Sequence, residues 1–206
     1  MPKLEIPRKT VYRLSIYQRC LNRLKGNGIE TVSSEALAKA AGVKPTQLRK
    51  DLTYFGHFGT RGLGYNVTGL IGAIGEVLGS SRLQPVILVG VGNLGAALLR
   101  YGGFQKEGFE IVAAFDTKPD PNRVKGLKTT LLNASGLTSY IQTQHIKMAI
   151  LTVPPMHSQE VVNNMVEAGI QAVLNFAPVV LDVPKHVVVN NVDLAVELEN
   201  LSYFIK

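Results

Sequence analysis

Three glycines, at positions 90, 92 and 95, have the spacing of a phosphate-binding turn. They lie in the stretch LVGVGNLGAALL (88–99), between an apolar strand-like run and an apolar helix-like run. Glycines in this order allow a tight turn and the close approach of a pyrophosphate, whose charge meets the N-terminus of the following helix. The context predicts a dinucleotide-binding loop, although glycines that only let a helix pack closely would have the same spacing.

Asp116 is the second residue that points to a dinucleotide. It lies 21 residues after Gly95, at the end of the apolar run EIVAAFD (110–116). An acid at this place accepts hydrogen bonds from both ribose hydroxyls and repels a 2′-phosphate. We therefore expect a preference for NAD(H) over NADP(H), which Lys118 nearby would weaken.

The residues that hydride transfer would need are hard to find. A dehydrogenase places a proton donor or acceptor beside the substrate carbonyl. Tyr101 and Tyr140 are each followed four residues later by glutamine, so neither forms a Tyr-x-x-x-Lys pair. His157 follows a predicted strand end and is the one serious candidate, but a loop or cap histidine is the simpler interpretation. The sequence favours a protein that is not an enzyme, with an NAD-dependent oxidoreductase carrying an accessory nucleic-acid-binding domain as the alternative.

Positive charge is concentrated in the first two-fifths of the chain. Residues 1–82 contain 13 Lys and Arg against 5 Asp and Glu, a net charge of +8, whereas residues 83–206 contain 9 against 10. The asymmetry suggests a polyanion as partner of the N-terminal part, although a solvated basic surface gives the same count. Because a short polar break lies at 79–84, we expect two domains, 1–82 and 83–206.

Composition excludes several other classes. The single cysteine, Cys20, rules out an intramolecular disulfide, and no Cys/His cluster has the spacing of a metal site. No apolar run approaches the roughly 20 residues of a membrane span. The N-terminus MPKLEIPRKT has no apolar core behind its charges, so a secretory signal is not expected there. The simplest location is a reducing cytoplasm.

Residues 33–52 have the pattern of a helix-turn-helix, preceded by a predicted helix over 8–25. Ser33 or Ser34 caps a short helix, Gly42 allows a tight turn, and Pro45 begins a second helix. The buried side of this second helix would contain Val43, Leu48 and Leu52. Its outward side would present Thr46, Gln47, Arg49 and Lys50, as in a DNA-recognition helix.

A glycine-rich stretch, TYFGHFGTRGLGYNV (53–67), follows directly. Its glycines alternate with aromatic residues, which predicts a short hairpin carrying Arg61, the wing of a winged-helix domain, with an ordinary loop as the alternative. Thr68 is expected to cap a fourth helix over 69–78.

Strands and helices alternate after residue 85. This alternation predicts a parallel sheet covered on both faces, the Rossmann arrangement. The expected strands are 86–90, 110–116, 147–153, 172–176 and 186–190, and the expected helices are 94–101, 135–143 and 157–169. The final stretch, 192–206, predicts a helix with many apolar side chains, which a second copy of the chain would bury.

The chain resembles the Rex family of redox-sensing transcriptional repressors over about residues 5 to 206. The segments that carry the resemblance are QLRKDLTYFGHFGTRGLGYNV, VGVGNLGAALL, VAAFD, AILTVP, AGIQAVLNFAP and NVDLAVELENLSYF. The resemblance implies a homodimer with N-terminal winged helices, Rossmann domains and exchanged C-terminal helices. It further implies that NADH releases a roughly palindromic operator DNA, that NAD⁺ opposes NADH, and that the targets are genes of fermentation and NADH oxidation.

The resemblance also assigns residues. Lys50 and its neighbours Thr46, Gln47 and Arg49 would enter the major groove, and Arg61 the minor groove. The adenosine diphosphate half of NADH or NAD⁺ would be held by Gly90, Val91, Gly92, Asn93, Leu94, Gly95 and Asp116. The positions near the nicotinamide or the dimer switch would be Tyr101, Pro154 and Asp193. The chain departs from the family's usual pattern at Pro155 and His157, where small residues are usual, and at Lys118, where an acid is usual. A sensor of another nucleotide, such as one with a 2′-phosphate, is a third reading.

Overall fold

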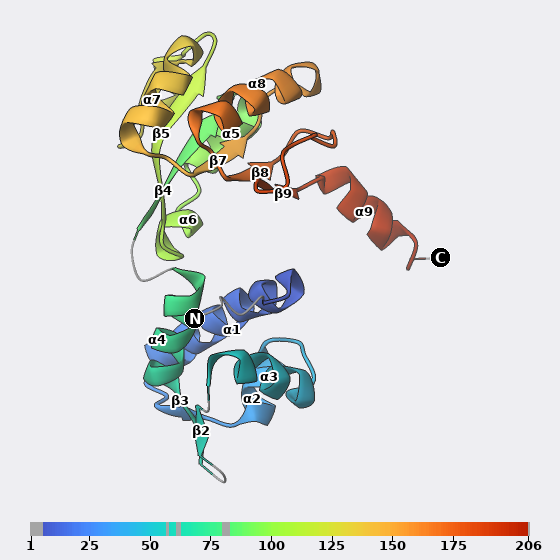
Figure 1. Ribbon diagram of the computed structural model, residues 1–206. Coiled ribbons are helices and arrows are strands. Elements are labelled where there is room, and N and C mark those ends of the chain that lie inside the picture. Colours follow the sequence, from blue (N-terminus) through green and yellow to red (C-terminus); the bar gives the residue numbers. More distant parts are fainter. Residues whose placement is uncertain (1–5, 57, 61–62, 80–82, 206) are drawn as a thin grey trace. The chain divides into compact units, whose positions relative to one another are not determined.

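The computed structural model describes residues 6–56, 58–60, 63–79 and 83–205. The chain forms two compact units, Met1–Arg82 and Leu83–Lys206, which are described separately (Figure 1). No helix among the described residues is long and apolar enough to cross a membrane.

The N-terminal unit is a helical domain with a small antiparallel sheet. Its helices are α1 (Arg8–Gly26), α2 (Ser34–Ala40), α3 (Pro45–Leu52) and α4 (Val67–Leu78), with a 3₁₀ turn η1 (Thr53–Phe55) after α3. Its strands β1 (Thr31–Val32), β2 (Gly59–Thr60) and β3 (Gly64–Asn66) pair in the order β1-β3-β2. Helices α2 and α3 form the helix-turn-helix, and β2 and β3 form the hairpin, so this unit is a winged helix.

Local signals explain where these helices begin. Ser33 caps α2 by accepting a hydrogen bond from the Ala36 amide, and Gly42 adopts the left-handed conformation (φ +68°) in the turn before α3. The prediction that Thr68 caps α4 is wrong. Asn66 does so, since its side chain accepts from the Gly69 amide at 2.7 Å and Val67 is already helical.

A single apolar core holds the N-terminal unit together. It combines residues of α1 (Leu14, Tyr17, Leu21) with Leu37 of α2, Leu48 of α3 and Leu70 and Ile74 of α4, all of them at most 1% exposed. Because α3 places its buried residues in this core, its opposite side remains at the surface.

The C-terminal unit contains a parallel six-stranded sheet in the order β6-β5-β4-β7-β8-β9. Its strands are β4 (Gln84–Val89), β5 (Phe109–Asp116), β6 (Thr130–Asn133), β7 (Met148–Leu151), β8 (Ala172–Asn175) and β9 (Val188–Asn191). Its helices are α5 (Asn93–Leu99), α6 (Gly103–Lys106), α7 (Leu137–Gln144), α8 (Pro155–Ala168) and α9 (Leu194–Ser202), with 3₁₀ turns η2 (Pro121–Val124) and η3 (Ala134–Gly136). The strand order reverses direction at β4, so the crevice beyond β4 and β7 is where such sheets bind ligands.

Apolar residues on alternate sides of the strands make two cores. Ile87 and Phe115 face α7 and α8, whereas Leu88 and Ala114 face α5. Figure 1 shows α7 and α8 on one side of the strands, as this division requires. The predicted two-sided cover is therefore present.

Several boundaries differ from the sequence expectations. Strand β6 was not predicted, because TLLN is a short edge strand with no fully buried residue. Strand β4 ends at Val89 rather than 90, since Gly90 turns the chain with φ +96°. Helix α5 ends at Leu99 rather than 101, and α9 at Ser202 rather than 206.

Helix α9 leaves the sheet after β9 and projects from the rest of its unit (Figure 1). None of its residues is buried. Its apolar side chains are nevertheless numerous, with Leu198 68% and Leu201 63% exposed.

Candidate functional site

The glycines of the loop between β4 and α5 have two kinds of surroundings. A Cβ on Gly90 would lie 2.8 Å from the carbonyl carbon and oxygen of Thr152, and one on Gly95 would collide with the Gly90 carbonyl oxygen. A Cβ on Gly92 would meet nothing within 4 Å. Gly90 and Gly95 therefore let the loop and α5 pack against the sheet, whereas Gly92 borders open space at the first turn of α5.

Thr152 anchors this loop from the neighbouring strand. Its hydroxyl donates to the Gly90 carbonyl oxygen at 2.6 Å, just beyond the end of β7. No sequence signal marks this residue, because a threonine after an apolar run is an ordinary strand end.

Asp116 lies beside the same loop, at the end of β5. Its Oδ2 accepts a hydrogen bond from the Val91 amide at 2.7 Å, and its Oδ1 accepts one from the Lys118 amide at 2.9 Å. Each carboxylate oxygen can accept a second hydrogen bond, so both can still accept from ribose hydroxyls. The structure thus brings together the glycine loop and the acid that the sequence placed 21 residues apart.

The residues present at this crevice fit a dinucleotide. Open space at Gly92 admits a phosphate close to the backbone, Asn93 and Leu94 are exposed in the first turn of α5, and the half-buried carboxylate of Asp116 borders the loop. Arg123 adds a cation that the sequence analysis did not single out. Its Nη1 donates to Asn93 Oδ1 at 3.1 Å, from a 3₁₀ turn that no sequence signal ties to the glycine loop.

The three positions assigned near the nicotinamide do not gather around this loop within one chain. Pro154 does lie near it, exposed at the N-cap of α8, just after β7. Tyr101 is 59% exposed beyond the opposite end of α5, with its ring edge-on to Phe104 at 5.1 Å. Asp193 caps α9 by accepting hydrogen bonds from the amides of residues 195 and 196, at the far edge of the sheet.

The surroundings of His157 resemble a helix start more than a reaction centre. The residue is exposed in the first turn of α8, and its amide donates to the Pro154 carbonyl oxygen at 3.0 Å. Among the described residues no group of three or more His, Cys, Asp or Glu could hold a metal ion.

Helix α3 presents three of the four side chains that the sequence assigned to its outward side. Leu48 and Leu52 are buried, whereas Thr46, Arg49 and Lys50 are exposed. Arg49 is held within its own unit, because its Nη1 donates to Ser34 Oγ at 2.9 Å and to Glu35 Oε1 at 3.2 Å. Val43 is only half-buried, and so is Gln47.

A buried carboxylate beneath α3 is a further feature that the sequence did not predict. Asp51 is 1% exposed and accepts from Arg13 Nε at 2.6 Å, Arg13 Nη2 at 2.7 Å and the Tyr17 hydroxyl at 2.8 Å. Gln47 Nε2 donates to it at 2.9 Å and the Thr10 hydroxyl at 3.4 Å. The available signal was a charged residue three positions after Leu48, on the inward side of the helix.

The pKa values follow from this arrangement. Burial of Asp51 by itself raises its pKa, but the hydrogen bonds from Arg13, Tyr17 and Gln47 outweigh it, so the pKa of this carboxyl lies below its usual range. Burial and the hydrogen bond to Asp51 raise the pKa of Tyr17. Asp51 is therefore ionised at neutral pH, and Tyr17 is neutral.

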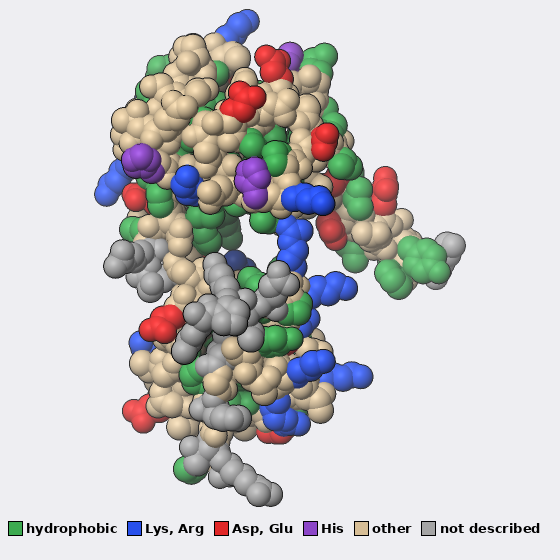
Figure 2. Space-filling model, in the orientation of Figure 1, with side chains coloured by type: hydrophobic (Ala, Val, Ile, Leu, Met, Phe, Trp, Pro, Cys, Tyr) green, Lys and Arg blue, Asp and Glu red, His purple; other side chains and the backbone are tan. Residues whose placement is uncertain are grey.

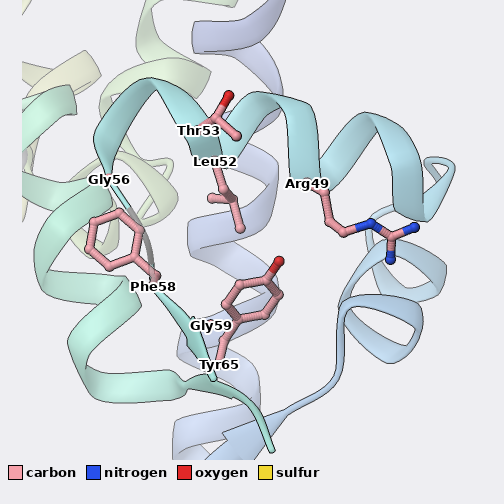
Figure 3. A pocket seen from close by; sticks show the side chains of 7 residues that line it. All are labelled: Arg49, Leu52, Thr53, Gly56, Phe58, Gly59 and Tyr65. Atoms are coloured by element: carbon pink, nitrogen blue, oxygen red, sulfur yellow. The ribbon is translucent and has the colours of Figure 1, made fainter. Parts of the chain in front are cut away.

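A shallow hollow separates the end of α3 from the hairpin (Figure 3). Its lining residues are Arg49, Leu52, Thr53, Gly56, Phe58, Gly59 and Tyr65. Gly59 is close against the Tyr65 ring, since a Cβ there would lie 3.0 Å from Cε1. Arg61, assigned to the wing, lies outside the described residues. Figure 2 shows Lys and Arg side chains spread over the surface of this unit.

Comparisons with known proteins match this chain along its length. A family described as "Putative DNA-binding protein N-terminus" matches residues 5–53, and one described as "CoA binding domain" matches residues 81–179. A redox-sensing transcriptional repressor Rex of Pelotomaculum thermopropionicum is 45% identical over 203 residues, 98% of this chain and 95% of that protein. The Rex repressor of Desulfitobacterium hafniense is 46% identical over 205 residues, 98% of this chain and 97% of its own.

Solved structures of RSP, a Rex-family repressor, are also similar. The crystal structure of RSP with β-NAD⁺ and operator DNA has a TM-score of 0.88 at 34% identity, covering 98% of this chain and 94% of that one. The crystal structure of RSP with β-NADH has a TM-score of 0.84 at 33% identity, covering 98% and 95%. The predicted fold, a winged helix followed by a Rossmann domain, is confirmed.

Proposed function

Because the chain belongs to the Rex family of redox-sensing transcriptional repressors, we propose that it represses transcription by binding operator DNA and releases that DNA on binding NADH. In this proposal residues 1–82 read the operator and residues 83–206 bind NADH or NAD⁺. The observation that carries it is the joint presence, in one chain, of an exposed polar face on α3 and of a glycine loop bordered by Asp116.

The dinucleotide would lie along the loop from Gly90 to Gly95. Amides of the first turn of α5 face its pyrophosphate, and Asp116 accepts from the adenosine ribose. These contacts are common to NADH and NAD⁺, so they supply affinity and no discrimination between the two. Discrimination belongs to the nicotinamide end, where ring charge and planarity differ and where we place Pro154, Tyr101 and Asp193.

Tyr101 and Asp193 lie far from the glycine loop of their own chain, which supports a role for a second copy. Helix α5 separates Tyr101 from the loop by about 10 Å. Asp193 follows β9, three strands from β4, about 14 Å across the sheet. A homodimer whose α9 helices are exchanged would let these residues act in the partner's site and would cover the apolar side chains of α9.

The switch requires that NADH bind the DNA-free form more tightly than the DNA-bound form. A tenfold shift in operator affinity needs about 1.4 kcal/mol of such difference. A few contacts at the nicotinamide end are enough for that. NAD⁺ opposes the release because it occupies the same adenosine site.

We further propose that the chain is a sensor and not an enzyme, acting in the cytoplasm on genes of fermentation and NADH oxidation. The exposed position of His157 in a helix start supports this, since hydride transfer needs a proton donor held beside a substrate.

The test is operator binding titrated in parallel with NADH, NAD⁺, NADPH and NADP⁺. Release by NADH alone, reversed by NAD⁺, is the expected result. Release by NADPH at equal concentration would assign the site to a 2′-phosphate nucleotide, with Lys118 as its contact. Oxidation of NADH by small carbonyl compounds, abolished in His157→Ala, would instead establish an oxidoreductase.

A further inference from the structure

Gln47 lies where the buried face of α3 meets its exposed face. Its Nε2 donates to Asp51 Oδ1 at 2.9 Å, one helical turn further along the chain. Its neighbours Thr46 and Lys50 are exposed, while Asp51 is 1% exposed. The side chain therefore links the surface of the recognition helix to the polar cluster beneath it.

The partner of Gln47 fixes which way its amide points. Asp51 is ionised beside Arg13, and an ionised carboxylate can only accept hydrogen bonds. Arg13 Nη2 and Gln47 Nε2 share Oδ1, while Arg13 Nε and the Tyr17 hydroxyl share Oδ2. The amide atom that faces Oδ1 must then be nitrogen, because an oxygen there would repel the carboxylate.

The rest of the Gln47 amide remains available. The nitrogen has two hydrogens, and one of them is sufficient for Asp51. No described residue donates to Oε1, and no unpaired side-chain polar atom is buried among the described residues, so Oε1 is open to solvent. The Gln47 amide thus presents one acceptor, Oε1, and one donor, the second N–H of Nε2, at the surface of α3. Asp51 fixes which of the two positions each occupies.

We propose that Gln47 reads an adenine in the major groove and that Asp51 is the positioning residue that sets its amide orientation. This inference rests on the proposed DNA-binding function. Adenine offers a donor at N6 and an acceptor at N7, which match the Gln47 oxygen and its free N–H. With the amide reversed, the Gln47 N–H would face the N6 donor of adenine and the Gln47 oxygen would face the N7 acceptor.

Arg49 and Lys50 carry only donors, so neither can match the donor and acceptor pair of adenine. Arg49 already donates to Ser34 and Glu35, and Lys50 is a flexible point charge. Gln47 differs from them because a buried residue of its own domain, Asp51, fixes which side of its amide carries the donor and which the acceptor. One A·T pair in each half-site should therefore depend on it.

The experiment uses the full chain and a pool of randomised duplex DNA. The duplex that the wild type enriches is remade with every single base-pair substitution, and affinities are measured for the whole panel. Gln47→Ala should lower the preference at one A·T pair per half-site by about five- to a hundredfold, with smaller changes elsewhere. Lys39→Ala, an exposed charge on α2, is the matched control and should keep the profile.

Asp51→Asn tests the positioning role. An asparagine can offer its own N–H to Gln47, so the amide order is no longer imposed, and the same A·T preference should fall. The double variant Gln47→Ala/Asp51→Asn should lose no further preference at that pair, because both changes act through the same amide. A purely structural role for Asp51 would instead make Asp51→Asn weaken every duplex by the same factor and keep the preference. If Asp51→Asn does not fold, Gln47→Glu provides the test, since a carboxylate repelled by Asp51 has no N–H for adenine N7.

Three results would overturn the inference. Gln47→Ala could weaken every duplex by the same factor, or Asp51→Asn could keep the A·T preference that Gln47→Ala loses. Retention of that preference in Gln47→Glu would count equally against it. A wild-type chain that enriches no sequence would overturn the proposed function itself, so the two failures are distinguishable.

Discussion

Helices α3 and α9 are nearly equal in length, eight and nine residues, but differ in what surrounds them. Helix α3 buries Leu48, Leu52 and the carboxylate of Asp51, whose partners all come from its own unit. Helix α9 buries nothing, although most of its side chains are apolar. Helix α3 therefore finds the partners of its buried side within its own unit, whereas α9 finds none among the described residues of its own chain and presents an apolar surface that suits a second copy.

Removal of residues 192–206 should change the protein's behaviour most. The chain should become monomeric, because the apolar side chains of α9 are the surface that we assign to the dimer. Operator affinity should fall by about 10²–10⁴-fold. In a dimer the second DNA-binding domain binds at a high effective concentration once the first is bound, whereas a monomer lacks this gain. Light scattering after size-exclusion chromatography and gel shifts measure both.

Glu199→Ala is the matched control for this deletion. The residue is exposed on α9, and the change leaves the apolar side chains in place, so dimerisation should persist. A truncated chain that stays dimeric would contradict the contrast between the two helices.

Next in size is the loss of the carboxylate under α3. Asp51→Ala leaves Arg13 and Tyr17 without their acceptor and should destabilise the N-terminal unit by about 3 kcal/mol. Asp193→Ala, which removes the N-cap of α9, should cost about 1 kcal/mol of stability. Urea unfolding of both variants makes the comparison, and equal losses would show that the two carboxylates are equivalent supports.

Asp116→Ala should weaken NADH binding by about ten- to a hundredfold, as expected for lost hydrogen bonds to a charged group. The affinity for NAD⁺ should fall by the same factor, because NADH and NAD⁺ have the same adenosine half. Operator binding without nucleotide should not change. Calorimetric titration measures the affinities, with Asp120→Ala as the control on the same exposed connection. An unchanged NADH affinity would remove Asp116 from the ribose site.

Lys50→Ala should weaken operator binding by about tenfold and leave NADH affinity unchanged. If its contact is a phosphate, the slope of log affinity against log salt should decrease by about 0.9. Arg61→Ala should act in the same direction. Lys106→Ala, in the C-terminal unit, is the charge-matched control, and gel shifts unaffected by Lys50→Ala and Arg61→Ala would defeat the assignment.

Near neutral pH, the free energy of unfolding that depends on Asp51 and Tyr17 should change least of all with the conditions. The pKa of Asp51 is lowered on folding, so its contribution is fully present above the ordinary value of 3.8 and is lost as the pH falls through the lowered pKa. The pKa of Tyr17 is raised, so its contribution is complete below 10.0 and is lost at higher pH. The difference in unfolding free energy between wild type and Asp51→Ala should therefore stay constant between these limits and decrease in acid. A difference that persists unchanged in strong acid would contradict this.

Much of the fold was predictable because its signals are local. The caps, the turn at Gly42 and the apolar strand runs each act over a few residues, and the structure has α1, α2, α3 and most strands where expected. Strand β6 was not predicted because it lies at the edge of the sheet, where a strand forms without the long apolar run that marks a buried one. Thr68 was misjudged because Asn66, two residues earlier, has the extended backbone that a cap requires.

The polar clusters were predictable only in part. Asp116 was expected beside the glycine loop because the spacing belongs to a recurring unit of strand and helix. Thr152 and Arg123 come from distant parts of the sequence, and only the parallel sheet brings them to the loop. Arg13, Tyr17 and Asp51 lie up to 38 residues apart, so their contact depends on how α1 crosses α3.

The amino-acid sequence was sufficient to predict the order of the two units, the glycine turn before α5 and the exposed side chains Thr46, Arg49 and Lys50 on α3, because these follow from short-range backbone chemistry and periodicity. Packing between distant segments was needed to make Asp51 a buried, ionised acceptor and to orient Gln47 toward it. The same packing leaves α9 with no buried residue in its own chain. Burial and hydrogen-bond partners depend on packing between distant segments, and no local pattern encodes them.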